Sequence, residues 1–150
     1  MHFSATYVHT NLVAKDWKKL ADFYQIVFGC IPVPPQRDLG GEAISNATAI
    51  MGAHILGMHM RLPGWGENGP TLEIFSYTPE LEHAPVAVNR PGFGHIAFLV
   101  DNVQNAIDAV LENGGCMVGK LVSVAVADHT VTFAYLTDPE GNVIEVQSWG

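Results

Sequence analysis

The stretch HTNLV at residues 9–13 has a counterpart in HIAFL at residues 95–99, and these two segments decide the fold. Each begins with a histidine. A second correspondence follows further along, where LEIFSY at residues 72–77 resembles IEVQSW at residues 144–149. The chain is therefore predicted to contain two copies of one structural unit, and each copy carries one histidine and one glutamate at matching places.

The first copy is predicted to begin with a strand over residues 3–12 and an amphipathic helix over residues 15–28, where apolar side chains recur at helical spacing. Asp16 is expected to cap this helix, and Gly29 to end it with a positive φ. Three prolines remove backbone donors after the helix, so residues 31–41 are expected to be a loop or a sheet edge. The rest is predicted as a short helix at 45–51, strands at 54–62 and 71–77, and a hairpin turn at 63–69.

The second copy follows a proline-punctuated linker over residues 79–92. Asp101 or Asn102 is expected to cap its helix, and residues 138–142 have the composition of a turn. Its elements are predicted as a strand at 94–100, a helix at 103–113 and strands at 116–124, 130–137 and 143–149. Both copies thus read as β-α-β-β-β modules, at about 1–78 and 93–150, within a single domain spanning residues 1–150.

Composition narrows the class of protein. Hydrophobic residues make up 48% and charged residues 15% of 150 residues, as in a globular domain with a sizeable core. No apolar run approaches the ~18 residues of a membrane span, and the N-terminus lacks the features of a signal peptide. We therefore expect a cytoplasmic protein that does not interact with membranes.

The net charge of −8 argues against a nucleic-acid partner, because binding phosphate requires clustered cations. Lys15, Lys18 and Lys19 form the only cluster and are expected to be a solvated helix face. Cys30 and Cys116 occupy equivalent places in the two copies, each after a glycine. Both are expected to be free thiols that act as small core residues.

The paired histidines and glutamates predict a metal site. Glu73 lies between Leu72 and Ile74, where burying a carboxylate without a charge partner is costly. A divalent cation would supply that partner, and this set of ligands suits Zn, Ni, Co, Mn or Fe(II). The predicted ligands are His9, Glu73, His95 and Glu145. Taken singly, each would be read as an ordinary surface or half-buried residue, so the prediction depends on the repeat.

The other histidines show no paired pattern between the two copies and are predicted to be non-ligands. His54 and His59 are expected to face opposite sides of one strand, because they are an odd number of residues apart. The full set of predicted non-ligands is His2, His54, His59, His83 and His129.

The chain resembles the vicinal oxygen chelate superfamily, which includes glyoxalase I, methylmalonyl-CoA epimerase, extradiol dioxygenases and the fosfomycin- and bleomycin-resistance proteins. The motifs that carry the resemblance are His9, LADFY at 20–24, FG at 28–29, LEI at 72–74, GHIAF at 94–98, DPEGN at 138–142 and IE at 144–145. It implies an α+β fold in which two tandem modules form one open curved sheet around a metal. It also implies a homodimer.

The ligand set resembles that of bacterial glyoxalase I. This implies a metal-dependent lyase or isomerase that moves a proton next to a carbonyl through a metal-bound enediolate, with Glu145 as the first choice of base and Glu73 as the second. The alternatives are an acyl-CoA epimerase, which usually has Gln at the position of Glu73, an Fe(II) ring-cleaving dioxygenase, and a non-catalytic drug- or metabolite-binding protein.

A small-molecule substrate is expected. Arg37 or Arg61 can hold a substrate carboxylate through a bidentate contact, and Trp65 can line a pocket. All three lie in the middle of the first copy, which is longer than the matching part of the second. We expect this unmatched length to select the substrate.

Overall fold

A computed structural model describes residues 2–150, which form nine strands and three helices. The chain divides into two compact units between Glu82 and His83. The predicted mixed α+β class is confirmed. The strands form two sheets, one of four strands and one of five, rather than the single sheet that the resemblance implies.

The first module contains β1 (His9–Val13), α1 (Trp17–Phe28), β2 (Ile31–Leu39), α2 (Glu42–Thr48), β3 (His54–Arg61) and β4 (Thr71–Thr78). Its strands lie in the order β1-β4-β3-β2. The β1–β4 pair is parallel, whereas β3 pairs antiparallel with both β4 and β2. The predicted hairpin is therefore β3–β4, and β4 lies in the interior of the sheet, between β1 and β3.

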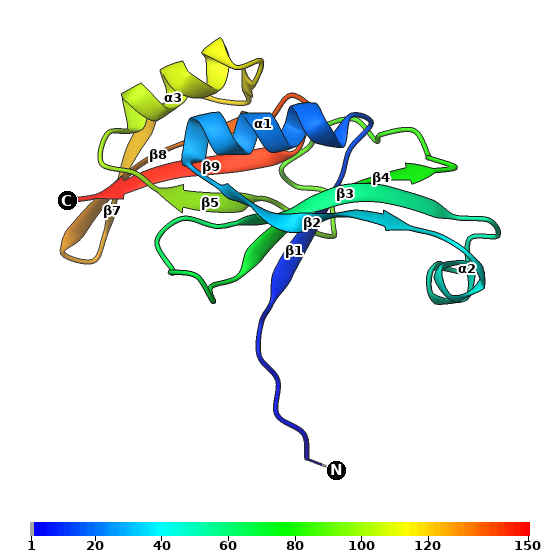
Figure 1. Ribbon diagram of the computed structural model, residues 1–150. Coiled ribbons are helices and arrows are strands. Elements are labelled where there is room, and N and C mark those ends of the chain that lie inside the picture. Colours follow the sequence, from blue (N-terminus) through cyan, green and yellow to red (C-terminus); the bar gives the residue numbers. More distant parts are fainter. Residues whose placement is uncertain (1) are drawn as a thin grey trace. The chain divides into compact units, whose positions relative to one another are not determined.

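Helix α1 has the two caps that the sequence predicts, although it starts at Trp17 rather than at residue 15. The Asp16 side chain accepts a hydrogen bond from the N–H of Lys19 at 3.1 Å, and Gly29 adopts the left-handed conformation with a φ of 71°. Leu20, Phe23 and Tyr24 are buried, and the helix packs against β3 and β4 (Figure 1). One face of the sheet is thereby closed by α1.

Two further boundaries in the first module differ from the prediction, while the proline segment forms a sheet edge, one of its two expected alternatives. The first strand starts at His9 rather than at residue 3, because its partner β4 begins opposite it at Thr71; residues 2–8 extend away from β1 without strand structure (Figure 1). The short helix starts at Glu42, three residues early. The proline segment is a sheet edge, β2, whose register shifts between Val33 and Arg37.

The second module contains β5 (Ile96–Leu99), α3 (Val103–Glu112), β6 (Cys116–Met117), β7 (Val122–Val126), β8 (His129–Thr137) and β9 (Val143–Trp149). The order is β5-β9-β8-β6, and β7 also pairs with β8. The single strand predicted over 116–124 is thus two short strands, interrupted at residues 118–121. The helix cap is Asn102, whose side chain accepts from the N–H of Asn105 at 2.9 Å.

The turn before β9 is organised by Asp138, which is 2% exposed. Its carboxylate accepts hydrogen bonds from the N–H groups of Glu140 and Asn142 at 2.9 and 3.0 Å, and from the Asn142 amide at 2.8 Å. These bonds satisfy a buried carboxylate and fix the hairpin that leads into Glu145.

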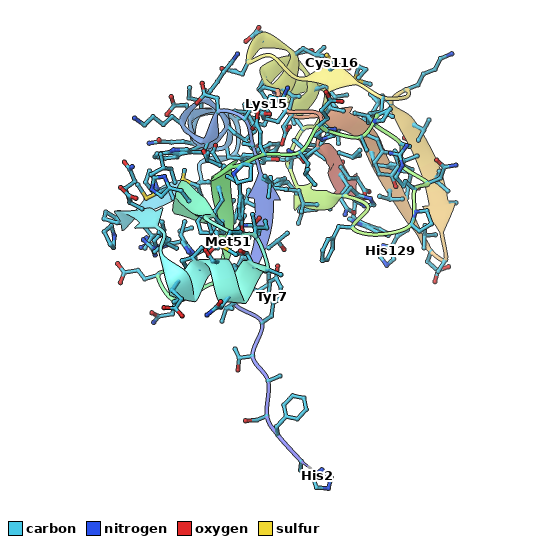
Figure 2. All side chains as sticks on the ribbon, turned by 90° about the vertical axis from the view of Figure 1, so that its right-hand side faces the viewer. His2, Tyr7, Lys15, Met51, Cys116 and His129 are labelled. Atoms are coloured by element: carbon cyan, nitrogen blue, oxygen red, sulfur yellow. The ribbon has the colours of Figure 1, made fainter. Side chains whose placement is uncertain are left out.

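The two cysteines differ in burial, which corrects the prediction that both are core residues. Cys30 is buried, whereas Cys116 is exposed (Figure 2). Cys116 belongs to β6, which is only two residues long and ends the order of its sheet. Both thiols are free, as expected. Among the described residues, no helix is long and apolar enough to cross a membrane.

Candidate metal centre

The first module gathers three potential metal ligands on one face of its sheet. His59 lies directly opposite Glu73 in the β3–β4 ladder, and His9 lies opposite Thr71 in the β1–β4 ladder. Strand side chains alternate between faces, so all three project from the side opposite to buried Leu72, which faces the α1 core.

Glu73 is the centre of this cluster. Its Oε2 lies 2.6 Å from Nε2 of His59, and its Oε1 lies 3.6 Å from Nε2 of His9. Oε1 also accepts a hydrogen bond from the Asn11 side-chain amide at 2.8 Å. With 12% of its side chain exposed, the carboxylate is screened from water and surrounded by nitrogen atoms. A carboxylate that is this little exposed is stabilised by a cationic partner, because burying an unpaired charge is costly.

His59 is held by both of its ring nitrogens. Nδ1 lies 3.1 Å from the Thr71 hydroxyl, while Nε2 faces Glu73. Burial lowers the pKa of His59, and the charge of Arg37 and the neighbouring His9 lower it further, against the opposing effect of Glu73. The neutral imidazole that a metal ion requires is thereby favoured.

The geometry of the cluster fits a divalent ion. One ligand atom each from His9, His59 and Glu73 falls within 4.8 Å of the others. Ligands about 2.1 Å from a common ion lie roughly 3–4 Å apart, so small side-chain rotations suffice to bring the three together. Two imidazoles and one carboxylate are also a common donor set for divalent transition metals.

The second module contains the other predicted pair. Nε2 of His95 lies 2.9 Å from Oε2 of Glu145, whose side chain is 14% exposed. The residue opposite Glu145 on the neighbouring strand is Tyr135, and its ring packs edge-on against His95 at 5.1 Å. Within each module, therefore, the structure brings the predicted histidine and glutamate together.

Of the three predicted substrate residues, two lie on the same face of the sheet as Glu73 and one lies on an exposed turn. Arg61 lies opposite Thr71 on the Glu73 face, and its Nε is buried without a hydrogen-bond partner among the described residues. Arg37 lies opposite Gly57, which shares that face, and donates to the Pro35 carbonyl. Trp65 is 71% exposed on the β3–β4 turn and is not part of the His9–His59–Glu73 cluster.

His59 is the residue that the sequence analysis left out of the site. Its counterpart in the repeat is Tyr135, so a search for ligands matched in both copies excludes it. The sequence did contain a usable signal for His59. In a hairpin centred on Gly66, His59 and Glu73 are equally far from the turn, so they lie opposite each other.

The other predicted non-ligands lie outside this cluster. His54 faces the opposite side of β3 from His59 and pairs with Asp38 at 2.5 Å. His2 and His129 lie on the N-terminal segment and at the β7–β8 hairpin (Figure 2).

Comparison with protein families gives one match over most of the chain. Residues 6–146 match the model of the Glyoxalase/Bleomycin resistance protein/Dioxygenase superfamily. A lactoylglutathione lyase of Schizosaccharomyces pombe is 30% identical over an alignment of 146 residues that covers 93% of this chain. The chain spans 46% of that relative, so it corresponds to about half of its length.

Comparison with solved structures agrees on the fold. A glyoxalase family protein from Bacillus cereus superposes with a TM-score of 0.82 at 16% identity, covering 99% of this chain and 96% of that one. A fosfomycin resistance protein from Listeria monocytogenes superposes with a TM-score of 0.60 at 16% identity, covering 97% and 93%. At these identities the likeness concerns the fold alone.

Proposed function

We propose a function from one premise: the chain belongs to the Glyoxalase/Bleomycin resistance protein/Dioxygenase superfamily. The proposed activity is that of a divalent-metal-dependent lyase or isomerase of the glyoxalase I type, acting on a small molecule. The observation that carries the proposal is the repeated His–Glu pair, His9 with Glu73 and His95 with Glu145. A histidine and a half-buried carboxylate in each module supply both metal ligands and a proton acceptor.

In this proposal the ligands are His9, Glu73, His95 and Glu145. A divalent ion held by these residues would act as a Lewis acid toward the substrate's oxygens. Glu145 removes the proton from the carbon next to the carbonyl and returns it to the neighbouring carbon, so no net proton is gained or lost. Glu73 is the second candidate for this role. Its contacts with His9, Asn11 and His59 hold it more firmly, which favours Glu145 as the mobile base.

Substrate binding is assigned to the two arginines near Glu73. The buried Nε of Arg61 has no hydrogen-bond partner among the described residues, and a substrate carboxylate would satisfy it. Arg37 lies close enough to His59 to lower its pKa. A substrate with a free carboxylate, such as a glutathione adduct, fits this cationic side of the site. Trp65 is proposed as a contact at its margin.

The test is a direct assay of proton transfer. The purified chain, loaded in turn with Zn, Ni, Co, Mn or Fe(II), is given the hemithioacetal of methylglyoxal and glutathione, and thioester absorbance is followed. We expect turnover with at least one metal and its loss in Glu145→Gln. Absence of turnover with every metal would overturn the glyoxalase assignment. A chain that binds an aromatic metabolite without metal would indicate a binding protein instead.

A further inference from the structure

We propose that β7 is a contact between two copies of this chain, in which the strand pairs antiparallel with its own copy across a two-fold axis at Val124. The surface consists of Val122–Val126, with Lys120 and Asp128 at its two ends. The inference goes beyond the proposed function, because it concerns assembly and depends on neither a metal ion nor a reaction. A homodimer is expected from the sequence, and β7 is the strand through which it would form.

The first argument is that one side of β7 has no strand beside it within the chain. Among the described strands β7 pairs only with β8, whereas β8 and β9 each have strands on both sides. Figure 1 shows β7 at the margin of the second sheet. Every residue of the strand is exposed, as is the whole segment 116–130 around it. An edge strand directs backbone N–H and C=O groups outward, so this side offers hydrogen bonds to another strand.

The second argument is the composition of β7. Val122, Val124 and Val126 point to one face of the sheet, and Ser123 and Ala125 point to the other. The strand contains no charged residue and no proline. Residues with β-branched side chains are those that pack best against a neighbouring strand. The edge is therefore suited to receive a further strand by main-chain pairing.

The third argument is that the sequence around β7 is complementary to itself when it runs antiparallel. With Val124 opposite its own copy, Val122 lies opposite Val126 of the partner subunit, so three valine pairs form on one face. The same register brings Lys120 of one chain near Asp128 of the other, because each lies four residues from Val124. Opposite charges thus meet at both ends of the contact.

These charges also distinguish the proposed pairing from its alternatives. Lys120 and Asp128 are exposed, and neither has an ion pair within the part of the chain that the structure describes. A parallel pairing in register would bring like charges together. An extended peptide from another protein would add to the same edge without this match of charge and register, so a second copy is the favoured occupant.

A contact of this size predicts a weak dimer. Standard interfaces involve about 20–30 residues on each side, more than β7 and its flanking residues provide. We therefore expect a dissociation constant of roughly 10–500 µM, with monomer and dimer in equilibrium.

The first experiment measures this equilibrium in the full chain by sedimentation velocity up to about 1 mM. Val124→Lys places two like charges at the two-fold axis. Val88→Lys is the control, because Val88 has the same exposed fraction of 46% but lies between β4 and β5. We expect Val124→Lys to weaken dimerisation by at least about 30-fold and Val88→Lys to stay within roughly threefold of the unmodified chain.

Circular dichroism verifies that both variants are folded. An unmodified chain that stays monomeric over this range would overturn the inference and leave the edge to a strand from another protein. Equal effects of Val124→Lys and Val88→Lys would overturn it as well, since the dimer would then form through a different surface.

The second experiment tests the register. Lys120→Asp and Asp128→Lys each produce like charges at both ends of the contact, so each variant alone should dimerise at least about tenfold more weakly than the unmodified chain. An equimolar mixture of the two variants should recover dimers, because opposite charges then meet at both ends. Native mass spectrometry identifies the mixed dimer by its mass.

Recovery in the mixture can come only from contacts between chains. Lys120 and Asp128 of one chain are separated by the five residues of β7, a strand about 17 Å long, which exceeds the Debye length of roughly 8–10 Å. Failure of the mixture to recover dimers would overturn the antiparallel two-fold pairing. Neither experiment involves metal binding or turnover, so the proposed function is judged separately.

Discussion

The two modules repeat one architecture but surround their glutamates differently. In the first module, Glu73 is contacted by His9, Asn11 and His59. In the second, the positions corresponding to Asn11 and His59 are Ala97 and Tyr135, and the nitrogen donor at Glu145 is His95. The repeat thus preserves one His–Glu pair per module and varies the neighbours.

The fold alone explains the His–Glu pair in each module, whereas individual residues determine what else contacts each glutamate. Parallel pairing of the first and last strands brings a histidine and a glutamate together in both modules. The neighbours of each carboxylate are set by single residues on adjacent strands. A heavily contacted carboxylate suits permanent metal binding, whereas one with fewer fixed partners suits a change of protonation. The predictions below test this division of roles between the modules.

The largest effect is expected from exchanging each carboxylate for an amide. Glu145→Gln should lower turnover by about a thousandfold, in the middle of the range for general base catalysis, and change metal affinity by less than about tenfold. Glu73→Gln should instead weaken metal binding by about a hundredfold or more. Thioester absorbance and chelator competition measure the two quantities. If Glu73→Gln mainly lowered turnover and Glu145→Gln mainly weakened metal binding, Glu73 would be the base and Glu145 the permanent ligand.

A large loss of stability is expected when the carboxylate of Asp138 is removed from the β8–β9 turn. The longer β3–β4 turn, which has no equivalent hydrogen-bonded carboxylate among the described residues, serves as the comparison. Asp138→Ala leaves two backbone N–H groups and the Asn142 amide without this acceptor, at a cost of about 2–4 kcal/mol. Glu67→Ala, on the exposed β3–β4 turn, should stay within about 0.5 kcal/mol. Urea unfolding measures both, and similar midpoints would contradict the prediction.

The equivalent cysteines should respond differently to alkaline pH. Burial raises the pKa of the Cys30 thiol from 9.0 to about 12. The folded chain therefore keeps this proton when the unfolded chain has lost it. The contribution to stability is complete below pH 9.0 and declines above it, by up to about 1.4 kcal/mol per pH unit.

Unfolding of Cys30→Ala and Cys116→Ala between pH 9 and 11 tests this difference. Removing Cys30 should flatten the decline of the unfolding free energy with pH, while removing exposed Cys116 should leave it as steep as in the unmodified chain. In addition, a thiol reagent at pH 8 should modify Cys116 readily and Cys30 only after unfolding. Equal labelling of both thiols in the folded chain would contradict the difference in burial.

The smallest effect is expected at the hydrogen bond that Asn11 donates to Glu73. Because Asn11 is exposed, Asn11→Ala should weaken metal binding by only about three- to fivefold, corresponding to roughly 1 kcal/mol. The matched substitution Ala97→Asn, opposite Glu145, should leave metal affinity unchanged. If it strengthens binding, a hydrogen bond to Glu145 supports the ion in the way that the Asn11 bond does at Glu73.

Much of the fold could be predicted because its signals are local. The side chains of Asp16 and Asn102 cap the starts of α1 and α3, and Gly29 ends α1 through its left-handed backbone. The strand boundaries were less accurate, since a strand begins where its partner begins. His9 opens β1 because Thr71 lies opposite it, and no property of residues 3–8 encodes that limit.

The candidate site could be predicted only as far as the repeat reached. His9 and Glu73, and likewise His95 and Glu145, were found because each has a counterpart, and each pair is close in the structure. His59 was missed because its counterpart is a tyrosine. Its place depends on cross-strand register, which follows from the hairpin rather than from any motif around the residue itself.

The proline-rich edge strand β2 has a consequence for how the chain behaves at high concentration. An exposed sheet edge is a template on which a second chain can add a strand, which is a common route to aggregation. Pro32, Pro34 and Pro35 have no N–H to offer such a strand, and the shifted register interrupts the remaining ladder. The outer edge of the first sheet is thus protected against continuation by another molecule, at the end of the sheet where β2 lies.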